Sequence, residues 1–376
     1  MTEIAFLIRS LDYGGAERYL LTLARALDKE RFSVTILYFY PGGALEDEFK
    51  ASGARMISLG KTGRWDLLRF GRRLVGHLRA LRPRVLHGFL VEPNLLVVFL
   101  KPLFPAARIV FGVHASRVYF ENYDRFTRLN FRLQCWLSRF ADLTIFNSDA
   151  GRAYHVAEGF PARKSLVIYN GIDTERFRPD GDAGRSVRAE FGVVEDDILI
   201  GHVGRLDPMK DHPSFLRAAA LLCRKSADVR FLCVGGGPED YLGELRRLAA
   251  ELGISEKVIW AGARADMPAI YSALDLLASS SYSEGFPNVI GEAMACGVPC
   301  VVTDIGDSAL IVGETGTVVL PRDPAALCAG IVSCLGRDLE ETGARARARI
   351  IENFSVERVA AETSAVLLRL VERETL

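Results

Sequence analysis

The sequence predicts an α/β protein with two Rossmann-like, doubly wound domains, each built on a parallel sheet. Short β-branched runs alternate with amphipathic stretches along the whole chain, as expected when crossover helices join parallel strands. The apolar runs are nearly continuous, which is typical of strands buried on both faces. At 376 residues the chain also exceeds the length that one compact core usually serves.

The first domain is predicted over residues 1–175. Apolar residues at helical spacing predict helices over 15–29, 65–82 and 125–140. Between them, strands are expected at these apolar runs: 4–8, 33–39, 55–59, 85–90, 107–113, 141–147 and 166–170. Because strands and helices alternate, we expect helices on both faces of one parallel sheet.

A second alternation follows a polar stretch, residues 173–196, that contains Gly and Pro and has no strand pattern, so it predicts a linker. The second domain is expected over 176–357, and a last helix, about 358–376, can pack back on the first domain. The predicted strands of the second domain are 198–204, 229–235, 258–262, 275–280, 300–304 and 317–321. Its predicted helices include 212–225, 239–253 and 324–336.

The composition, 49% hydrophobic and 25% charged, is that of an ordinary globular protein. The seven cysteines form no CxxC or Cys/His cluster, so we expect small buried side chains in a reducing compartment. The first ten residues lack the pattern of a secretion signal. The longest apolar run, 95–100, is far shorter than the roughly 20 residues that span a bilayer. We therefore expect a cytoplasmic protein.

Charge is divided unevenly between the two halves. Residues 1–180 hold 27 Lys+Arg against 18 Asp+Glu, whereas residues 181–376 hold 20 against 29, so a basic half is available for an anionic partner. The predicted helix 65–82 is basic and amphipathic, and could lie on the anionic inner face of a membrane. A helix packed on its own sheet with a solvated basic face explains the pattern equally well. Nucleic acid is not expected, since the basic residues lack interleaved aromatic platforms.

Several candidate site elements follow predicted strands, and ligands of open α/β sheets bind at the carboxyl ends of strands. Gly14 and Gly15, followed by Glu17, open the first predicted helix, where free amides attract an anion and glycine lets the backbone approach it. The pattern is neither the GxGxxG fingerprint nor a P-loop. A tight strand-to-helix turn is the alternative.

Two loops of the second domain suit a phosphate ligand. One carries Gly204, Arg205 and Lys210, which offer a bidentate fork and a mobile point charge to a diphosphate. Ordinary solvated cations would look the same in the sequence. The other is a run of three glycines that begins with Gly235 and Gly236, a backbone that side chains cannot crowd. A structural turn would explain it nearly as well.

The most specific stretch is EGFPNVIGEAMACGVP, residues 284–299. We predict a helix over about 287–296, because Pro287 suits a helix start and Gly297 suits the residue after a helix end. Glu284 would lie at the positive end of this helix. Glu292 lies inside a largely apolar helix, where an acid needs a partner that a sugar hydroxyl could supply. A capped helix with an ordinary exposed glutamate is the alternative.

Taken in order, these elements resemble the retaining glycosyltransferase family 4, the group 1 glycosyltransferases with the GT-B fold. Two further elements carry the resemblance, which covers nearly the whole chain: NGID at 170–173, and His114 at the end of the predicted strand 107–113. A lone histidine in that place can equally be a structural residue. The resemblance implies two Rossmann-like domains that face an interdomain cleft.

The resemblance also implies roles for single residues. Glu284 and Glu292 match the family's E-x7-E element, which assigns Glu284 to the donor sugar and Glu292 to the ribose. Arg205 and Lys210 would bind the diphosphate, and His114 would lie beside the transferred sugar. The candidate catalytic residues are thus Arg205, Lys210, Glu284 and His114. The remaining donor-binding candidates are Gly14, Gly15, Gly204, Gly235, Gly236, Phe286, Pro287, Asn288, Val289 and Glu292.

As activity, the resemblance implies a retaining, metal-independent transfer that needs no cofactor. The donor would be a nucleotide-diphosphate sugar, with UDP favoured over GDP, and the acceptor a saccharide or lipid-linked saccharide in polysaccharide or glycolipid biosynthesis. The departing diphosphate would take the proton of the acceptor. A monomer or a homodimer is expected. Two alternatives stay open: a sugar-nucleotide 2-epimerase of the same architecture, and a nucleotide-sugar-binding subunit without turnover.

Overall fold

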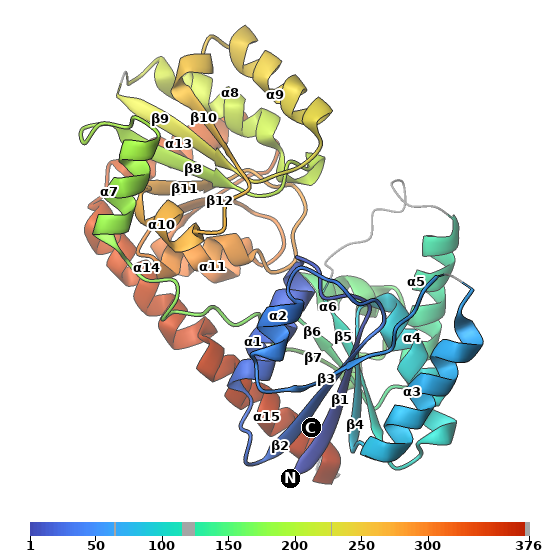
Figure 1. Ribbon diagram of the computed structural model, residues 1–376. Coiled ribbons are helices and arrows are strands. Elements are labelled where there is room, and N and C mark those ends of the chain that lie inside the picture. The colour runs from blue at the N-terminus through green and yellow to red at the C-terminus, as the bar shows by residue number, and fades with distance from the viewer. Residues whose placement is uncertain (64, 115–124, 227, 373–376) are drawn as a thin grey trace. The chain divides into compact units, whose positions relative to one another are not determined.

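The chain folds into two compact units, shown in the computed structural model of Figure 1. The structure describes residues 1–63, 65–114, 125–226 and 228–372. Unit 1 holds Met1–Gly171 together with the C-terminal segment that begins at Val356, and unit 2 holds Ile172–Ser355. The chain therefore passes from one unit to the other twice, between 171 and 172 and between 355 and 356. The sequence analysis places these boundaries at 175 and 357.

Unit 1 is built on a seven-stranded parallel sheet with the order β3-β2-β1-β4-β5-β6-β7. The strands are β1 (Thr2–Ile8), β2 (Phe32–Tyr38), β3 (Arg55–Ser58), β4 (Val85–Phe89), β5 (Arg108–Val113), β6 (Leu143–Phe146) and β7 (Ser165–Val167). Ile4 to Ile8 have no exposed surface, as a strand covered on both faces requires. The predicted parallel architecture is confirmed here.

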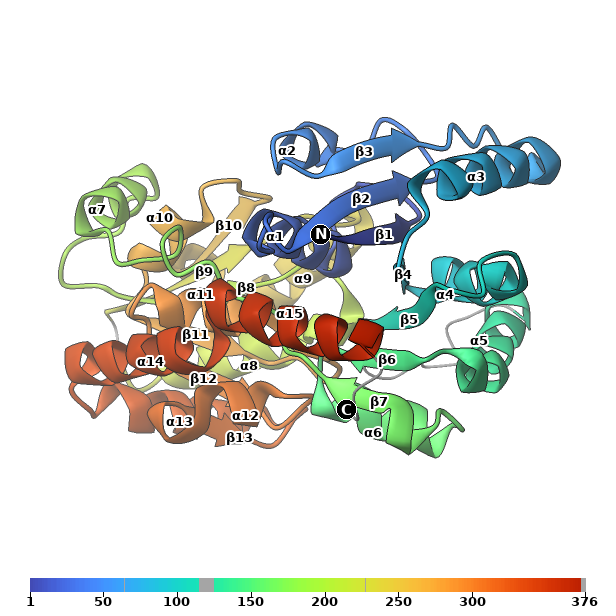
Figure 2. The ribbon, with the colours of Figure 1, turned by 90° about the horizontal axis from the view of Figure 1, so that it is seen from below.

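Helices cover both faces of this sheet (Figures 1 and 2). They are α1 (Gly15–Ala26), α2 (Glu46–Lys50), α3 (Leu67–Leu81), α4 (Val91–Leu100), α5 (Arg125–Leu137), α6 (Asp149–Ala157) and α15 (Val356–Glu372). Leu20 of α1 and Leu367 of α15 share one buried core. Leu74 of α3, Val97 of α4 and Phe131 of α5 share another. The helices α3, α4 and α5 thus form one layer, and α1 contacts α15 in a second.

Unit 2 is built on a six-stranded parallel sheet with the order β10-β9-β8-β11-β12-β13. Its strands are β8 (Ile198–Val203), β9 (Val229–Val234), β10 (Val258–Gly262), β11 (Leu276–Ser279), β12 (Cys300–Thr303) and β13 (Thr317–Val319). Its helices are α7 (Gly181–Glu190), α8 (His212–Cys223), α9 (Glu239–Glu251), α10 (Met267–Ser272), α11 (Asn288–Ala295), α12 (Ser308–Val312), α13 (Pro324–Leu335) and α14 (Leu339–Phe354). The strands β8 and β11 are neighbours at the centre, so the loops that follow them meet.

Two helices of unit 2 depart from the sequence-based expectation. The stretch 173–196 holds no strand but does contain α7, which packs on α10, so it is more than a linker. The helix α14 has no counterpart among the predicted helices, and two of its four buried residues, Gly343 and Ala346, are small, which weakens its apolar period. A side chain at Gly343 would overlap the carbonyl oxygen of Gly297, and Ala346 is fully buried. Six of the seven cysteines are buried, and all seven are free thiols.

Candidate functional site

Lys210 and Glu284, 74 positions apart in the sequence, meet at the carboxyl ends of β8 and β11. Lys210 Nζ lies 2.5 Å from Glu284 Oε1, and both side chains are largely buried. The hydroxyl of Ser281 donates to the same carboxylate oxygen at 2.7 Å. Because Glu284 is held from two sides, its position is set before any ligand arrives. The structure thus brings together two of the predicted site residues and adds Ser281, which the sequence analysis did not single out.

The backbone around Lys210 is tied to the end of β11. The buried hydroxyl of Ser280 lies 2.9 Å from the carbonyl oxygen of Lys210 and 2.8 Å from that of Asp211, and can donate to either. Asp211 adopts a φ of +49°, which is uncommon outside glycine, and its side chain caps α8 at the amide of Ser214. The methylenes of Lys210 lie over Gly204, where a Cβ would come within 3.2 Å of them. These contacts fix the backbone of Lys210 and the first methylenes of its side chain.

Arg205 lies on the same loop but is not part of this cluster. Its side chain is 76% exposed, and its guanidinium is 3.4 Å from the carboxylate of Asp207. Asp207 in turn accepts from the amide of Met209 at 2.9 Å. An exposed ion pair of this length constrains the side chain weakly. Arg205 can therefore swing over a wide arc, whereas Lys210 is already positioned.

The helix α11 begins close to the predicted position and ends where Gly297 allows it. Pro287 is the N-cap rather than the first helical residue, and Gly297 has a φ of +77° just past the C-cap. Phe286 is buried and its ring lies 5.6 Å from that of Phe354, so only its backbone is available to a ligand. Asn288 and Val289 are half-buried in the first turn. At the start of this helix, a ligand could therefore contact the backbone and the Asn288 side chain, but not the Phe286 ring.

Glu292, four residues after Asn288 on α11, has a protein partner that the sequence analysis missed. The phenol of Tyr271 on α10 donates to Glu292 Oε2 at 2.9 Å. Tyr271 is fully buried, and burial together with the nearby Glu292 carboxylate raises the pKa of its phenol well above the ordinary value. The phenol therefore stays protonated and serves as the donor. A sugar or ribose hydroxyl would be a second partner for this carboxylate and not the first.

The glycine run after β9 is required mainly by contacts between loops. A Cβ at Gly235 would overlap the carbonyl oxygen of Gly204, and the φ of Gly235 is +149°. The amide of Leu206 donates to the carbonyl of Gly236 at 2.8 Å, and a Cβ at Gly237 would meet Leu206 at 2.5 Å. The expectation of a backbone kept open for a ligand therefore applies to Gly236 alone, where the nearest atom to a Cβ is 3.4 Å away.

The candidates in unit 1 lie at the carboxyl ends of β1 and β5. A Cβ at Gly14 would overlap the carboxylate of Glu17, whereas no atom lies within 4 Å of a Cβ at Gly15. Gly15 thus leaves open space beside the start of α1. Burial raises the pKa of the Glu17 carboxyl.

His114 is packed between rings. Its imidazole stacks on Phe89 at 5.1 Å and tilts against Tyr19 at 4.9 Å. Among the described residues its Nδ1 is buried without a hydrogen bond. Burial lowers the pKa of His114 to about 3, so the ring is neutral near pH 7. It can donate or accept one hydrogen bond but carries no charge.

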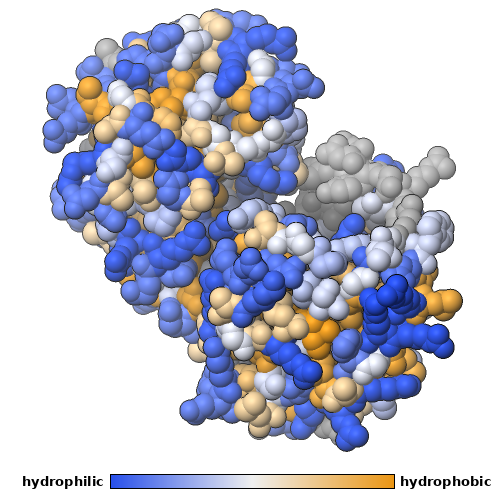
Figure 3. All heavy atoms as spheres, in the orientation of Figure 1, coloured by the Kyte–Doolittle hydropathy of each residue, from blue (hydrophilic) through white to orange (hydrophobic). Residues whose placement is uncertain are grey.

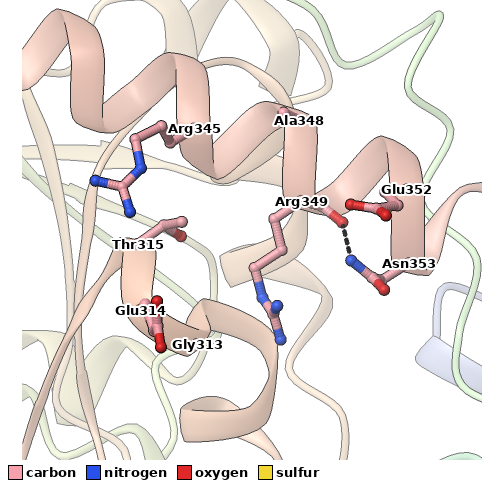
Figure 4. Close-up of a pocket in the computed structure, with 8 residues that line it drawn as sticks. All are labelled: Gly313, Glu314, Thr315, Arg345, Ala348, Arg349, Glu352 and Asn353. Atoms are coloured by element: carbon pink, nitrogen blue, oxygen red, sulfur yellow. Dashed lines mark hydrogen bonds between the residues drawn. The ribbon is translucent and has the colours of Figure 1, made fainter.

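A hollow of about 440 Å³ lies elsewhere in unit 2, between α14 and the turn at 313–315 (Figure 4). None of the predicted site residues lines it. Arg349 from α14 donates to the carbonyl oxygens of Leu310 and Ile311 and so holds the end of α12. Since Arg349 is engaged by backbone, we assign it a structural role.

No group of three or more His, Cys, Asp or Glu side chains that could hold a metal ion occurs in the described parts of the chain. The residues gathered at Lys210 and Glu284 are donors and one carboxylate, which suits an anionic ligand next to hydroxyl groups. A diphosphate joined to a sugar has that chemistry.

Two family models match the chain. The model described as Glycosyltransferase Family 4 matches residues 13–176, and the model described as Glycosyl transferases group 1 matches residues 197–337. The two matches fall on different units and leave little of the chain uncovered.

Relatives and solved structures extend this similarity. The chain is 26% identical to a Bacillus subtilis protein named as glycosyltransferase EpsF, over 80% of this chain and 79% of that one. It is 36% identical to the D-inositol 3-phosphate glycosyltransferase of Rhodococcus erythropolis over 57% of this chain, and it spans about half the length of that relative, 50%. The fold is similar to that of Anabaena Alr3699/HepE in complex with UDP, with a TM-score of 0.86 and 24% identity over 97% of this chain and 99% of that one. It is also similar to sucrose-phosphate synthase from Thermosynechococcus elongatus, with a TM-score of 0.81 and 22% identity over the full length of both.

Proposed function

The chain belongs to the group 1 glycosyltransferases of family 4, and from this membership we propose that it moves a sugar from a nucleotide-diphosphate sugar to a saccharide or lipid-linked saccharide. The observation that carries the proposal is the pairing of Lys210 with Glu284 at 2.5 Å. A fixed cation for a phosphate thus lies next to a fixed acceptor for sugar hydroxyls.

Within unit 2 the donor would be held by groups of different mobility. Lys210 is preorganised by the backbone contacts of Ser280, and it would hold one phosphate as a point charge. Arg205 is exposed and would close on the diphosphate when the donor binds. The start of α11 adds the fixed positive end of a helix. Glu292 would accept from the ribose while Tyr271 holds its other side.

The transfer itself needs charge stabilisation on the leaving group. The bond from the anomeric carbon to the diphosphate breaks, and the bond from the acceptor oxygen to that carbon forms on the same face. The proton of the acceptor hydroxyl passes to an oxygen of the departing diphosphate. Preorganised donors stabilise such developing negative charge effectively, so Lys210, Arg205 and the α11 start would serve in place of a metal ion. His114, being neutral, would hydrogen-bond the transferred sugar without opposing that charge.

The donor is proposed to be a UDP-sugar, with a GDP-sugar second. The Anabaena protein of similar fold has been crystallised with UDP and with UDP-glucose, and this supports the order of preference. The test is a thermal-shift series with UDP, UDP-glucose, GDP and GDP-mannose. A ligand at 100 times its Kd adds about 2.7 kcal/mol to the free energy of unfolding, which is readily measured. Stabilisation by the GDP compounds alone would reverse the order.

Catalysis is tested with a donor identified in this way. Lys210→Ala and Arg205→Ala are each expected to lower kcat by about 10²–10³, the usual cost of one donor to a developing oxyanion. Arg246→Ala, an exposed arginine on α9, is the matched control and should leave kcat unchanged. Unaltered turnover in both site variants would defeat the assignment.

Two further measurements separate the related functions. Free nucleoside diphosphate should appear only when an acceptor is added. Its release without acceptor, together with an epimerised sugar nucleotide, would indicate the 2-epimerase. Stabilisation by a donor with no turnover on any acceptor would indicate a binding subunit. The anomeric configuration of the product, measured by proton NMR, should equal that of the donor. An inverted configuration would refute the retaining mechanism but not the glycosyl transfer itself.

A further inference from the structure

The exposed apolar side chains of unit 1 are concentrated on one helical layer. This layer consists of α3, α4 with the following turn Lys101–Leu103 (η1), and α5 with the following turn Ser138–Phe140 (η3). In both ribbon views α4 lies between α3 and α5 (Figures 1 and 2). The large exposed side chains on it include Trp65, Leu68, Phe99, Leu129, Trp136 and Phe140. We call these residues and the arginines between them the α3–α5 face.

The inner side of the same layer is packed in the ordinary way. Phe70, Leu74 and Leu78 of α3 are buried, as expected if the predicted helix 65–82 packs on its own sheet. Trp65 and Leu68, by contrast, are each 87% exposed. The apolar residues of this helix therefore serve two purposes. One set is used in the core, and the other is exposed on the outer side of the layer.

Arginines share the outward side with these apolar groups. Leu68, Arg69 and Arg72 of α3 lie at positions i, i+1 and i+4 and are all exposed. Trp65 is exposed as well and lies two residues before the helix begins at Leu67. On α5, Leu129, Arg132 and Trp136 lie at positions i, i+3 and i+7 and are exposed, and the exposed Phe140 follows in η3. Figure 3 shows hydrophobic and strongly hydrophilic side chains next to one another over the part of unit 1 where Figure 1 draws α3.

Basic residues predominate on this face, and the one acid of α4, Glu92, is ion-paired with Arg9 at 3.0 Å. Asp66 is the only acid in residues 65–82, and residues 127–140 contain none. Arg69, Arg72 and Arg132 take part in no ion pair within the described residues. Arg117, which adds to the basic bias of the sequence, lies outside the described residues. A face with arginines between single apolar side chains suits an anionic partner that has an apolar layer below its charged groups.

We propose that the α3–α5 face docks the protein on an anionic lipid surface, with the aromatic and leucine side chains entering the interface and the arginines contacting lipid phosphates. Tryptophan and isolated apolar side chains favour the zone between headgroups and acyl chains, and arginines bind anionic headgroups. A second copy of the chain would place arginine against arginine if the two used this face symmetrically, which disfavours a dimer. Within the described residues no helix is long and apolar enough to cross a bilayer. The proposal concerns contact with one leaflet and does not depend on glycosyl transfer.

The test is co-sedimentation with two kinds of vesicle at low salt. Vesicles of phosphatidylcholine with phosphatidylglycerol are expected to bind the protein, those of phosphatidylcholine alone to bind it weakly, and added salt to release it. Each arginine near an anionic surface contributes about fivefold to the partition coefficient. The variant with Arg69→Gln, Arg72→Gln and Arg132→Gln should therefore bind on the order of 100-fold less.

A second variant tests the apolar contribution. Trp65→Ser with Leu68→Ser and Trp136→Ser should reduce binding to both vesicle types while the charge is unchanged. The control carries Arg217→Gln, Arg246→Gln and Leu320→Ser, exposed positions in unit 2, and should bind as the parent does. All variants should keep the parental thermal shift with nucleotide sugar, which separates this test from that of the proposed function.

Two outcomes would overturn the proposal. In one, both face variants bind anionic vesicles as tightly as the parent and the control. In the other, the variants leave vesicle binding unchanged but convert a dimer to a monomer in sedimentation velocity, which would assign the face to a second copy of the chain.

Discussion

The hydrogen bond from Tyr271 to Glu292 makes a quantitative prediction for Tyr271→Phe. The substitution removes one oxygen from a fully buried ring, and with it the hydroxyl that donates to Glu292 Oε2 at 2.9 Å. A hydrogen bond to a charged group contributes about 1.5–3 kcal/mol. Part of this is recovered because Glu292 is only half-buried and water can reach it. We therefore expect the free energy of unfolding to fall by about 1.5 kcal/mol, at the lower end of that range.

The same substitution should change how the donor is bound. If Glu292 accepts from the ribose, the looser carboxylate should raise KM for the donor with little change in kcat, because the ribose contact is alike in the ground and transition states. The direct assay is affinity for nucleoside diphosphates that lack the 2′ or the 3′ hydroxyl. The parent should lose about 10-fold or more on removal of the contacted hydroxyl, and Tyr271→Phe should lose less.

Tyr38→Phe supplies the control. The phenol of Tyr38 donates to Glu46 at 3.0 Å in unit 1, so the substitution removes a comparable hydrogen bond from a different place. It should cost stability without altering the response to the deoxy nucleotides. The reasoning is refuted if Tyr271→Phe and the parent discriminate equally between nucleotides with and without the ribose hydroxyl.

Three other changes have defined outcomes. Gly235→Ala should destabilise unit 2 and abolish turnover, since its Cβ would overlap the carbonyl oxygen of Gly204. Gly15→Ala, where a Cβ meets no atom within 4 Å, should leave the melting temperature unchanged and weaken donor binding. Equal effects of the two substitutions on melting temperature and donor binding would contradict these expectations. Burial lowers the pKa of His87 to about 3 in the folded protein, whereas a histidine in the unfolded chain has a pKa of about 6.5. As the pH falls, the unfolded state therefore takes up a proton first, and the free energy of unfolding decreases below about pH 6.5. His87→Leu should remove about 2 kcal/mol of the loss between pH 7.5 and 5 in urea unfolding, and an unchanged pH dependence would show that His87 is not its source. EDTA should leave turnover unaltered, and a loss restored by Mg²⁺ would contradict transfer without a metal.

The local sequence pattern was sufficient to predict those helices and strands whose residues show one clear pattern, either an apolar run or a helix-ending glycine. Apolar runs identified the strands of both sheets, and the signal was strongest where a strand is covered on both faces, as β1 is. The end of α11 was readable from Gly297, since a φ of +77° favours glycine. The helix α14 was missed because two of its four buried residues, Gly343 and Ala346, are small, so that its apolar period depends on Ile350 and Phe354 alone.

For the candidate site, the sequence predicted which residue types follow the ends of strands, but not which of these side chains contact one another. Lys210 and Glu284 were recognisable as a cation and an acid in loops after strands, and adjacency of β8 and β11 then brought them to 2.5 Å. Tyr271 gave no signal, because its partner Glu292 lies on another helix and a buried tyrosine resembles any core residue until that helix is placed. The chemical type of each site residue is given directly by the sequence. Which groups share a hydrogen bond, and which glycines have room for a ligand rather than a neighbouring loop, depends on how distant segments pack.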